Sequence, residues 1–263
     1  MSPVPSQTAD GVLCQLDQAC AYLTLSASAR HNALSIAMWQ ELRTLALDLA
    51  QNQAVRVIVI RGAGAHFAAG ADISEFPRQR NNAAQARDYH ENIISPALQA
   101  LLACPQVIVA AIQGDCIGGG LEIACCADLR LASPDARFGI PIQKLGFALA
   151  PAEMALLLQT VSPACAAELL LEARLFTAPE ALARGLLSRV CDDLETALAQ
   201  TLPALLNAAP LALAMHKKML RTLPQRALTS AEIAAVYSLM DSQDYQRGMQ
   251  AFLNKHSPIF QGD

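Results

Sequence analysis

The chain has 263 residues, which is enough for one large domain or two small ones and for a substantial hydrophobic core. Apolar residues make up 53% of it and charged residues only 16%, a balance that excludes a disordered chain and predicts an oligomer whose other subunits cover part of the apolar surface. The net charge is −4 and the 19 basic residues form no dense run, so the composition argues against a nucleic-acid-binding protein.

The cysteines and the N-terminus bear on location. The eight cysteines include no Cys-x-x-Cys pair and have no histidine at zinc-finger spacing, so we expect no metal site and a reduced, cytoplasmic environment. The opening "MSPVPSQTAD" lacks the basic start and the apolar stretch of a signal peptide, and no apolar run approaches the roughly eighteen residues of a membrane span. We therefore expect neither a signal peptide nor contact with a membrane.

The first half of the chain predicts an α/β fold. Residues 11–26 contain two short apolar stretches around a turn and predict a β-hairpin, and residues 35–52 have helical periodicity behind a Ser35 N-cap. Residues 55–62 and 106–114 are continuous apolar runs typical of buried strands, which we expect to be parallel neighbours.

Helical segments separate and follow these two strands. Between them, residues 84–104 predict a helix with a kink near Pro96. From about Pro151 the sequence is rich in alanine and leucine and predicts a helical region, interrupted by one strand at 185–190. The elements expected before that region are a glycine loop, a short apolar helix, a strand and an extended piece, at residues 118–120, 121–127, 128–133 and 137–141.

The strand-and-glycine stretch at residues 55–73 invites comparison with a dinucleotide-binding turn. Such a turn needs three glycines in the pattern G-x-G-x-x-G. Gly62 and Gly64 fit this pattern, but Phe67 stands where the third glycine is required. We therefore interpret Gly62 and Gly64 as a tight loop after a strand and expect no nicotinamide or flavin site.

The glycine run Gly118–Gly120 lies directly before a helix. Helix starts present unpaired N–H groups and the positive end of a dipole, and glycines allow a ligand to approach the backbone. If the two buried strands are neighbours, the backbone N–H groups of Ala69 and Gly119 converge on one carbonyl oxygen and form an oxyanion hole. A flexible turn is an equally good interpretation of the glycines taken alone.

Several sequence blocks together resemble the crotonase, or enoyl-CoA hydratase/isomerase, superfamily. The resemblance covers nearly the whole chain, from "HNALS" at residues 31–35 to "GMQAFLNKHSPIF" at residues 248–260. The blocks that carry it most clearly are "FAAGADI" at 67–73, "GGGLE" at 118–122, "CADLRLAS" at 126–133 and "RFGIP" at 137–141.

The resemblance implies an α/β fold in which ββα units form a spiral and a C-terminal helical region follows. We expect a crotonase-like core over residues 1–195 and a helical trimerisation region over residues 196–263. It also implies a homotrimer or hexamer, an acyl-CoA thioester as the partner, and no cofactor beyond the coenzyme A of the substrate.

The resemblance also assigns site residues. The oxyanion donors correspond to the backbone N–H groups of Ala69 and Gly119. The substrate-binding residues it implies are Ala71, Asp72 and Ile73 for the adenine, Arg30 and His31 for the pantetheine and phosphates, Ile142 near the acyl group, and Lys255 for the phosphates of this or a neighbouring subunit. Arg30, His31 and Lys255 are equally compatible with ordinary surface charges.

The carboxylates depart from the family pattern. Glu122 follows the glycines in an otherwise apolar helix start, which favours a catalytic acid over a structural partner of the helix dipole. The second glutamate of family hydratases is absent, because Ile142 occupies its place. Glu153 either supplies the missing acid or begins a surface helix, and its "PAE" context favours the surface helix. No role is assigned to His66 or His90.

These features predict a carbon–oxygen lyase that adds water to an enoyl-CoA thioester or removes it. The oxyanion hole would stabilise the enolate, and Glu122 would deprotonate the attacking water. Alternatives on the same fold are an enoyl-CoA isomerase, a decarboxylase, a thioester hydrolase and an acyl-CoA-binding protein without activity. A serine hydrolase is disfavoured because no G-x-S-x-G motif is present.

Overall fold

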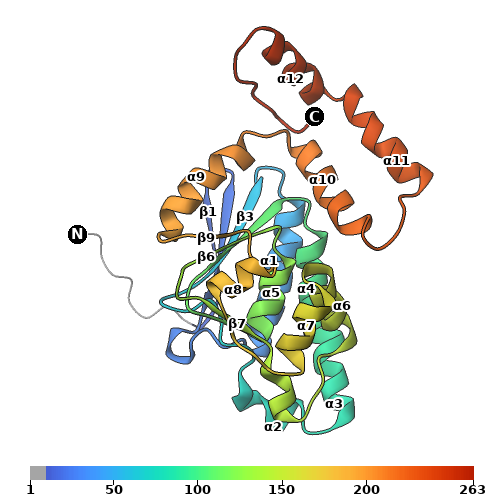
Figure 1. The fold of residues 1–263 in the computed structure, drawn as a ribbon. Coiled ribbons are helices and arrows are strands. Elements are labelled where there is room, and N and C mark those ends of the chain that lie inside the picture. Colours follow the sequence, from blue (N-terminus) through green and yellow to red (C-terminus); the bar gives the residue numbers. More distant parts are fainter. Residues whose placement is uncertain (1–9) are drawn as a thin grey trace.

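The computed structural model describes residues 10–263, so the expectation about a signal peptide falls on residues 1–9, outside the described part. The centre is a six-stranded sheet in the order β1–β2–β3–β4–β6–β9, visible in the middle of Figure 1. Its strands are β1 (Gly11–Asp17), β2 (Cys20–Ser26), β3 (Val57–Gly62), β4 (Val107–Ile112), β6 (Leu129–Ala132) and β9 (Arg189–Val190).

The pairing of these strands agrees with the sequence. β1 and β2 form the predicted hairpin, in which Asp17 lies opposite Cys20. β3 pairs in parallel with β2, and β4 pairs in parallel with β3 with Val57 opposite Val107. The prediction that the two buried strands are parallel neighbours is confirmed. Their carboxyl ends therefore lie at the same edge of the sheet, and the loops that follow them begin side by side.

Both faces of β3 are buried, which explains its continuous apolar sequence. Ile58 and Ile60 contribute to a core shared with helices α1 (Ile36–Gln51), α4 (Ser95–Ala103) and α5 (Gly119–Cys126). Val57 and Val59 point to the other face, where they pack in a second cluster with side chains of helix α9 (Leu194–Leu206). The sheet is thus covered by helices on both sides.

The first helical layer contains α1 (Ile36–Gln51), α3 (Ala83–Asp88) and α4 (Ser95–Ala103). Ser35 caps α1 as predicted, because its Oγ accepts a hydrogen bond from the Met38 N–H at 3.3 Å. α3 and α4 are joined by a π-helical segment, Tyr89–Ile94, in which the Ser95 N–H donates to the His90 carbonyl five residues earlier. The helix predicted for residues 84–104 is therefore present. The irregularity expected near Pro96 is this wider π-helical turn, which comes just before Pro96, a residue with no N–H to donate.

A small second sheet supports the loops at the sheet edge. It has the order β5–β7–β8, with β5 (Asp115–Ile117), β7 (Arg137–Gly139) and β8 (Phe176–Thr177). β5 and β8 were not expected, because strands of two or three residues carry no alternation to detect. The neighbouring helices are α2 (Phe76–Gln79), α5 (Gly119–Cys126), α6 (Pro151–Thr160), α7 (Pro163–Leu170) and α8 (Ala178–Ala183), with 3-10 turns at Ser28–Arg30, Ile73–Glu75 and Pro141–Leu145.

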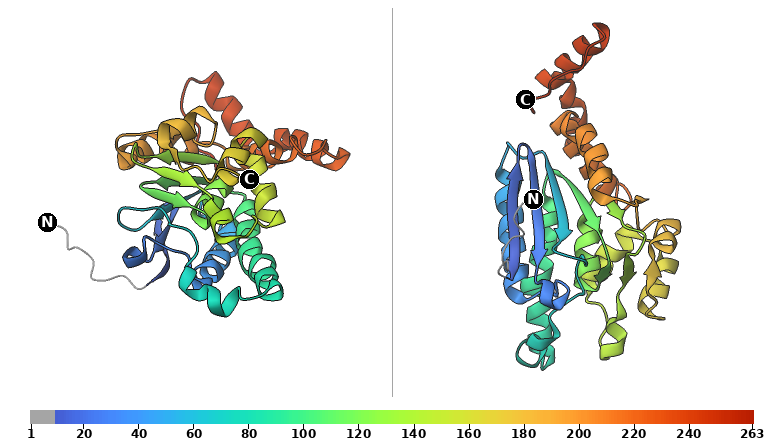
Figure 2. Two further views of the ribbon diagram at one scale, coloured as in Figure 1. Left: turned by 60° about the horizontal axis from the view of Figure 1, so that its bottom comes forward. Right: turned by 90° about the vertical axis from the view of Figure 1, so that its left-hand side faces the viewer.

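The C-terminal helices are arranged differently from the rest. α9 (Leu194–Leu206) packs on the sheet, and α10 (Pro210–Thr222) follows it, whereas α11 (Ser230–Tyr237) and α12 (Gln243–Leu253) extend away from the sheet in Figures 1 and 2. The 3-10 turn Ser238–Asp241 joins these last two helices. α10 is tied to the core by Asp128, whose carboxylate lies 2.9 Å from Lys217 Nζ and 2.8 Å from Arg221 Nη2.

Within residues 10–263, no single helix has the length and apolar character required to cross a membrane; only α9 and α10 taken together meet that test, and they are bent by 106° at their junction.

Candidate active site

Two glycine-containing loops meet at the carboxyl edge of β3 and β4. Gly70 has a φ of 102° and Gly118 a φ of 49°, backbone conformations that favour glycine. The loops are in close contact, because a Cβ built on Gly118 would lie 3.7 Å from Gly70 Cα, and one on Gly70 would lie 3.2 Å from the Ile117 carbonyl oxygen. At Gly70 both the positive φ and the tight approach to Ile117 favour glycine, and at Gly118 the positive φ alone does, because 3.7 Å is an ordinary contact distance.

The backbone donors at this contact are Gly119 and Ala71. Gly119 is the first residue of α5, so its N–H has no acceptor one turn earlier in the helix. Ala71 forms a parallel bridge with Leu34, in which the Gly70 carbonyl and the Asp72 N–H make the two hydrogen bonds. The N–H of Ala71 itself therefore points away from Leu34, and Ala71 lines the cavity on that other side.

The assignment of Ala69 as an oxyanion donor requires correction. Its N–H donates to the carbonyl oxygen of His31 at 2.9 Å, so it is already engaged in a hydrogen bond and is not free for a ligand. The N–H of Ala71, a residue that we expected to contact the adenine, points away from Leu34 and is available to a ligand instead. The two residues flank Gly70, whose φ of 102° turns the backbone between them, so their N–H groups have different surroundings.

Glu122 lies one helical turn into α5, with 7% of its surface exposed. Its Oε2 atom is buried and has no hydrogen-bond partner among residues 10–263. Burial raises the pKa of Glu122 well above its usual range, the negative charge of Glu153 raises this pKa further, and the Arg80 guanidinium acts in the opposite direction. This environment therefore favours the neutral form of the Glu122 carboxyl group over the charged form.

Glu122 faces a cavity of about 310 Å³ between the two loops and the helical layer. Its remaining walls are mainly apolar and aromatic, as is usual for a small-molecule site. The lining residues that were assigned a role from the sequence are Ala69, Ala71, Ile73, Gly119, Glu122 and Ile142. The other lining residues are Trp39, Gly70, Phe76, Arg80, Tyr89, His90, Ile94, Ile117, Gly118, Ile140, Pro141, Lys144 and Leu145.

Arg80 is the principal cation of the cavity wall. Its guanidinium carbon lies 4.3 Å from the ring centre of Phe76, 5.5 Å from that of Tyr89 and 5.1 Å from that of Phe147. Burial lowers the pKa of Arg80, while Tyr89 and the acids Glu153 and Glu122 act to raise it. Three aromatic rings thus hold a positive charge close enough to Glu122 to influence its proton affinity.

The expectation that Glu153 lies on a surface helix is wrong. Its side chain is 1% exposed, and its carboxylate oxygens lie 2.8 and 3.0 Å from Nδ1 of His90, which is itself buried. Glu153 occupies the first turn of α6, as the "PAE" context indicated, but this end of α6 packs inward against the π-helical segment. The sequence pattern predicts where the helix begins, but it does not show which part of the chain packs over that end.

Arg80, Tyr89, His90 and Glu153 were therefore missed or undervalued. They come from three separate segments, and no spacing rule connects residue 90 with residue 153. The one available signal was the polar pair Tyr89–His90 in the turn before Ser95–Pro96, where a local irregularity of the helix was expected.

Arg30 and Asp72 lie together beside the cavity but outside its walls. They form an ion pair, and Arg30 also contacts Asp10 at 2.6 Å. Asp72 is 5% exposed and additionally accepts hydrogen bonds from Ser74, which, with Arg30, lower the pKa of Asp72. Asp72 therefore fixes the loop that contains Ala71, and Arg30 is partly committed to this ion pair.

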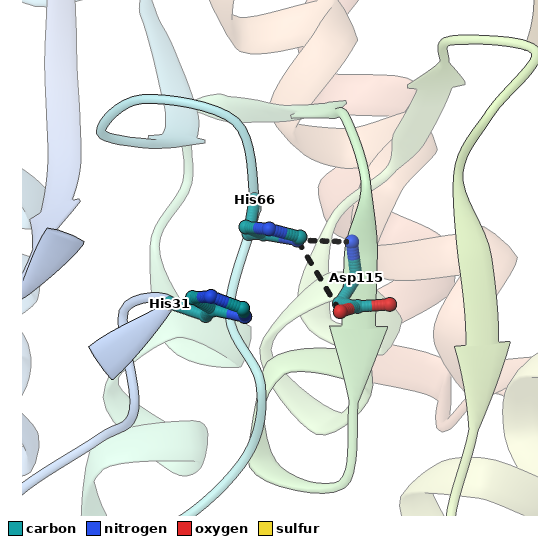
Figure 3. Close-up of side chains that lie close together, drawn as sticks. All are labelled: His31, His66 and Asp115. Carbon is teal, nitrogen blue, oxygen red and sulfur yellow. Dashed lines mark hydrogen bonds and ion pairs between the residues drawn. The ribbon is translucent and has the colours of Figure 1, made fainter. Parts of the chain in front are cut away.

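His31 is exposed and packs on His66, as Figure 3 shows. The two rings are nearly parallel, 8° apart, with their centres separated by 4.1 Å. Asp115 lies beside them, and its N–H donates to His66 Nδ1 at 3.1 Å. The ligand atoms of these three residues are within 4.8 Å of one another, but that hydrogen bond occupies the lone pair which a metal ion would need at His66 Nδ1. We assign no metal to this cluster.

Lys255 lies directly after α12 and is not part of the cavity wall of its own chain. Figure 1 shows α12 on the far side of the molecule from α2, which borders the cavity. The structure therefore does not bring Lys255 to this cavity within one chain.

Comparisons with known proteins show the family of the chain. Residues 15–263 match the family model described as enoyl-CoA hydratase/isomerase. The chain is 31% identical over 236 residues to the cyclohexa-1,5-dienecarbonyl-CoA hydratase of Thauera aromatica, covering 88% of this chain and 89% of that protein. It is 33% identical over 247 residues to the 2,3-dehydroadipyl-CoA hydratase of Escherichia coli K12, covering 91% and 94%.

Solved structures give the same result. The crystal structure of an enoyl-CoA hydratase/carnithine racemase from Magnetospirillum magneticum superposes with a TM-score of 0.93 at 38% identity, covering 98% of this chain and 97% of that one. The chain belongs to the enoyl-CoA hydratase/isomerase family, and its fold is that of the crotonase superfamily.

Proposed function

We propose that this enzyme adds water to the double bond of an enoyl-CoA thioester, or removes it in the reverse direction. The observation that carries the proposal is the convergence of two backbone donors, Ala71 and Gly119, with the buried carboxyl of Glu122 in one apolar cavity. The names of the hydratases described above, which act on conjugated acyl-CoA substrates, support the same reaction class.

The oxyanion donors supply the electrostatic part of the mechanism. Attack of water at C3 moves the electrons of the double bond toward the thioester oxygen, which becomes negatively charged. The N–H groups of Ala71 and Gly119 stabilise that charge, and donors of this kind are worth about 2.7–4 kcal/mol each in the transition state. The dipole of α5, whose N-terminus is at Gly119, acts in the same direction.

Glu122 supplies the proton chemistry at C2. From the sequence we expected Glu122 to act as the base toward water, but its raised pKa favours the neutral carboxyl, which is the form of a general acid. We therefore propose that Glu122 protonates C2 of the enolate, and that in the dehydration direction its carboxylate removes the same proton. No cofactor beyond the coenzyme A of the substrate takes part in this scheme.

Crotonyl-CoA is the direct probe of the proposal. Incubation with the purified enzyme is expected to remove the absorbance of the conjugated thioester and to give 3-hydroxybutyryl-CoA, identified by its mass. Free coenzyme A would indicate a thioester hydrolase, an isomeric enoyl-CoA an isomerase, and unchanged crotonyl-CoA bound to the protein a binding function.

We also propose that the chain assembles with copies of itself, as a trimer or hexamer, through α11 and α12. These helices expose large apolar side chains, among them Tyr237 at 69%, Phe252 at 85% and Leu253 at 71% exposure. Apolar surface of this extent on helices that extend from the core is characteristic of an interface.

A further inference from the structure

The reaction proposed above needs two proton-transfer groups, and Glu122 is one of them. Water must lose a proton as it attacks C3, and C2 must gain one. The place where the family resemblance would put a second glutamate is occupied by Ile142, which lines the cavity but cannot transfer a proton. A second group must therefore come from elsewhere in the wall.

His90 has the features of that group. It lines the same cavity as Glu122, and its side chain is 7% exposed. Its Nε2 atom is buried and has no hydrogen-bond partner among the described residues. A buried polar atom without a partner costs free energy, so its position beside a ligand cavity points to a contact made with the ligand or its water.

Glu153 determines which nitrogen of His90 is available. Both of its carboxylate oxygens lie within hydrogen-bond distance of Nδ1, at 2.8 and 3.0 Å, and a carboxylate can only accept. Nδ1 therefore carries the hydrogen, and in the neutral imidazole the lone pair is on Nε2. A carboxylate that holds a histidine in this way also stabilises the imidazolium once a proton has been taken up.

The orientation of the imidazole is fixed on its other sides as well. The ring stacks on Phe147 with centres 5.4 Å apart, and Tyr89 meets it edge-on at the same distance. The π-helical segment turns Tyr89 and His90 inward, and such segments are frequent at functional sites. The position of Nε2 is thus set by packing and by a hydrogen bond, as a catalytic base requires.

We infer that His90 is the second catalytic residue of the proposed reaction, acting as the base toward water, and that Glu153 is its positioning residue. This inference rests on the proposed function and adds to it the group that the sequence lacks at residue 142. His90 and Glu153 together take the place of a second glutamate.

Nε2 of His90 takes a proton from water while the water oxygen bonds to C3. The C2–C3 π electrons then form the C1–C2 double bond of the enolate, and the carbonyl π electrons move to the thioester oxygen. In the second step the C1–C2 π electrons form a C2–H bond with the proton of Glu122, and the oxygen electrons restore the carbonyl. The 3-hydroxyacyl thioester leaves behind a His90 imidazolium and a Glu122 carboxylate, and solvent carries one proton from the first to the second.

The variants His90→Gln and Glu153→Gln test the inference with crotonyl-CoA as substrate. We expect kcat of His90→Gln to fall at least about a hundredfold, the lower end of the effect of a general acid or base. The dissociation constant for butyryl-CoA, which has no double bond to hydrate, should change less than about threefold. His216→Gln and Glu172→Gln, which change exposed residues outside the cavity, should retain wild-type kcat within about twofold.

The positioning role of Glu153 needs a readout that would stay the same if Glu153 only stabilised the fold. The pH profile of kcat/KM reports the groups that face the cavity, namely Glu122, His90, Arg80, Tyr89 and Lys144, with Glu153 behind them. His90→Gln should remove one limb of this profile. Glu153→Gln should shift the same limb along the pH axis and lower kcat at least about tenfold. Glu153→Asp, which keeps the carboxylate, should restore part of the lost kcat. Wild-type kcat in folded His90→Gln, or a profile unchanged in Glu153→Gln, would overturn the inference while leaving the hydratase function intact.

Nitrogen NMR of the histidines distinguishes this failure from failure of the proposed function. If the enzyme does not hydrate crotonyl-CoA, the hydratase proposal fails for this substrate, and the arrangement of His90 remains measurable. The His90 signal, identified by its loss in His90→Gln, should show hydrogen on Nδ1, and its Nε2 resonance should shift when butyryl-CoA binds. Hydrogen on Nε2 in the neutral ring, or an Nε2 resonance that does not shift when butyryl-CoA binds, would contradict the inference. This holds whether or not the enzyme hydrates crotonyl-CoA.

Discussion

Gly120 packs so closely against Ala68 that a Cβ at residue 120 would lie 2.6 Å from the Ala68 carbonyl oxygen and 2.9 Å from the Ala68 Cβ. Ala68 also pairs with the strand before α5, since it bridges Cys116 and its carbonyl accepts from the Ile117 N–H at 2.9 Å. The loop that contains Ala71 and the helix that begins at Gly119 are therefore held together at backbone distance. The distance between the N–H groups of Ala71 and Gly119, the two proposed oxyanion donors, depends on this contact.

Gly120→Ala tests that dependence. Alanine is the better helix former, so a helix-propensity effect alone would stabilise the protein. We expect instead a loss of about 1–3 kcal/mol in the free energy of unfolding from overpacking, with a fall in kcat on crotonyl-CoA, because the two loops must separate. Gly11→Ala is the matched control, since its Cβ would meet the flexible end of the Glu41 side chain at 2.9 Å. A stabilised and fully active Gly120→Ala would show that the close contact is not needed.

The stability of the protein should depend on pH through Glu122. Its pKa in the folded state is raised above the usual 4.5, so between these two values the folded protein holds a proton that the unfolded chain has lost. This proton contributes to the free energy of unfolding. The contribution is fully present below about pH 4.5 and is lost as pH rises through the raised pKa.

Glu122→Gln removes that titration and keeps the shape of the side chain. The melting temperature of the variant minus that of the wild type should therefore increase between about pH 5 and pH 8, at about 2–4 °C for each kcal/mol. Scanning calorimetry at several pH values measures this difference. A difference that stays constant over the range would mean that Glu122 is ionised throughout.

Arg80→Met should shift the activity profile toward higher pH. The guanidinium lowers the pKa of Glu122, so its removal leaves the carboxyl protonated to a higher pH. If Glu122 acts as the acid, the descending limb of the kcat/KM profile should move upward by roughly one pH unit, the lower end of the effect of a close opposite charge. Arg78→Met, an exposed neighbour, is the control and should leave the limb in place. A limb that moves downward would contradict the acid role.

Phe252→Asp should break the proposed assembly. Phe252 is the most exposed of the large apolar side chains of α12, and a carboxylate there would carry charge into an interface between copies. Sedimentation at several concentrations should show a wild-type oligomer and a smaller species for the variant. Leu171→Asp changes a side chain of similar exposure after α7 and should leave the assembly unchanged. An unaltered oligomer in Phe252→Asp would place the interface elsewhere.

The sequence was sufficient for the elements with a long periodic pattern. The hairpin, α1 with its Ser35 cap, and the parallel pair β3 and β4 were all predicted, because each depends on local spacing. α12 lies inside the C-terminal region that was expected to be helical, although its own bounds were not predicted. β5 and β8 are too short to show alternation.

The site was predictable only where a motif carries it. The "GGGLE" block led to Gly119 and Glu122 of the proposed site, whereas Ala71, the partner donor that we propose, depended on which N–H groups the bridge to Leu34 leaves free. His90 and Glu153 meet across 63 residues through the packing of α6 on the π-helical segment, a tertiary contact that no local pattern encodes. The same packing accounts for the error over the exposure of Glu153.

The most direct test is hydration of crotonyl-CoA in water enriched in heavy oxygen, with wild type, Glu122→Gln and Glu172→Gln compared side by side. We predict that wild type and Glu172→Gln form 3-hydroxybutyryl-CoA with the heavy atom on C3, and that Glu122→Gln is at least about a hundredfold slower while still binding butyryl-CoA. Product formed by Glu122→Gln at the wild-type rate, or heavy oxygen found in a released carboxylic acid instead of the 3-hydroxy group, would contradict the assignment of Glu122 as the acid of an enoyl-CoA hydratase.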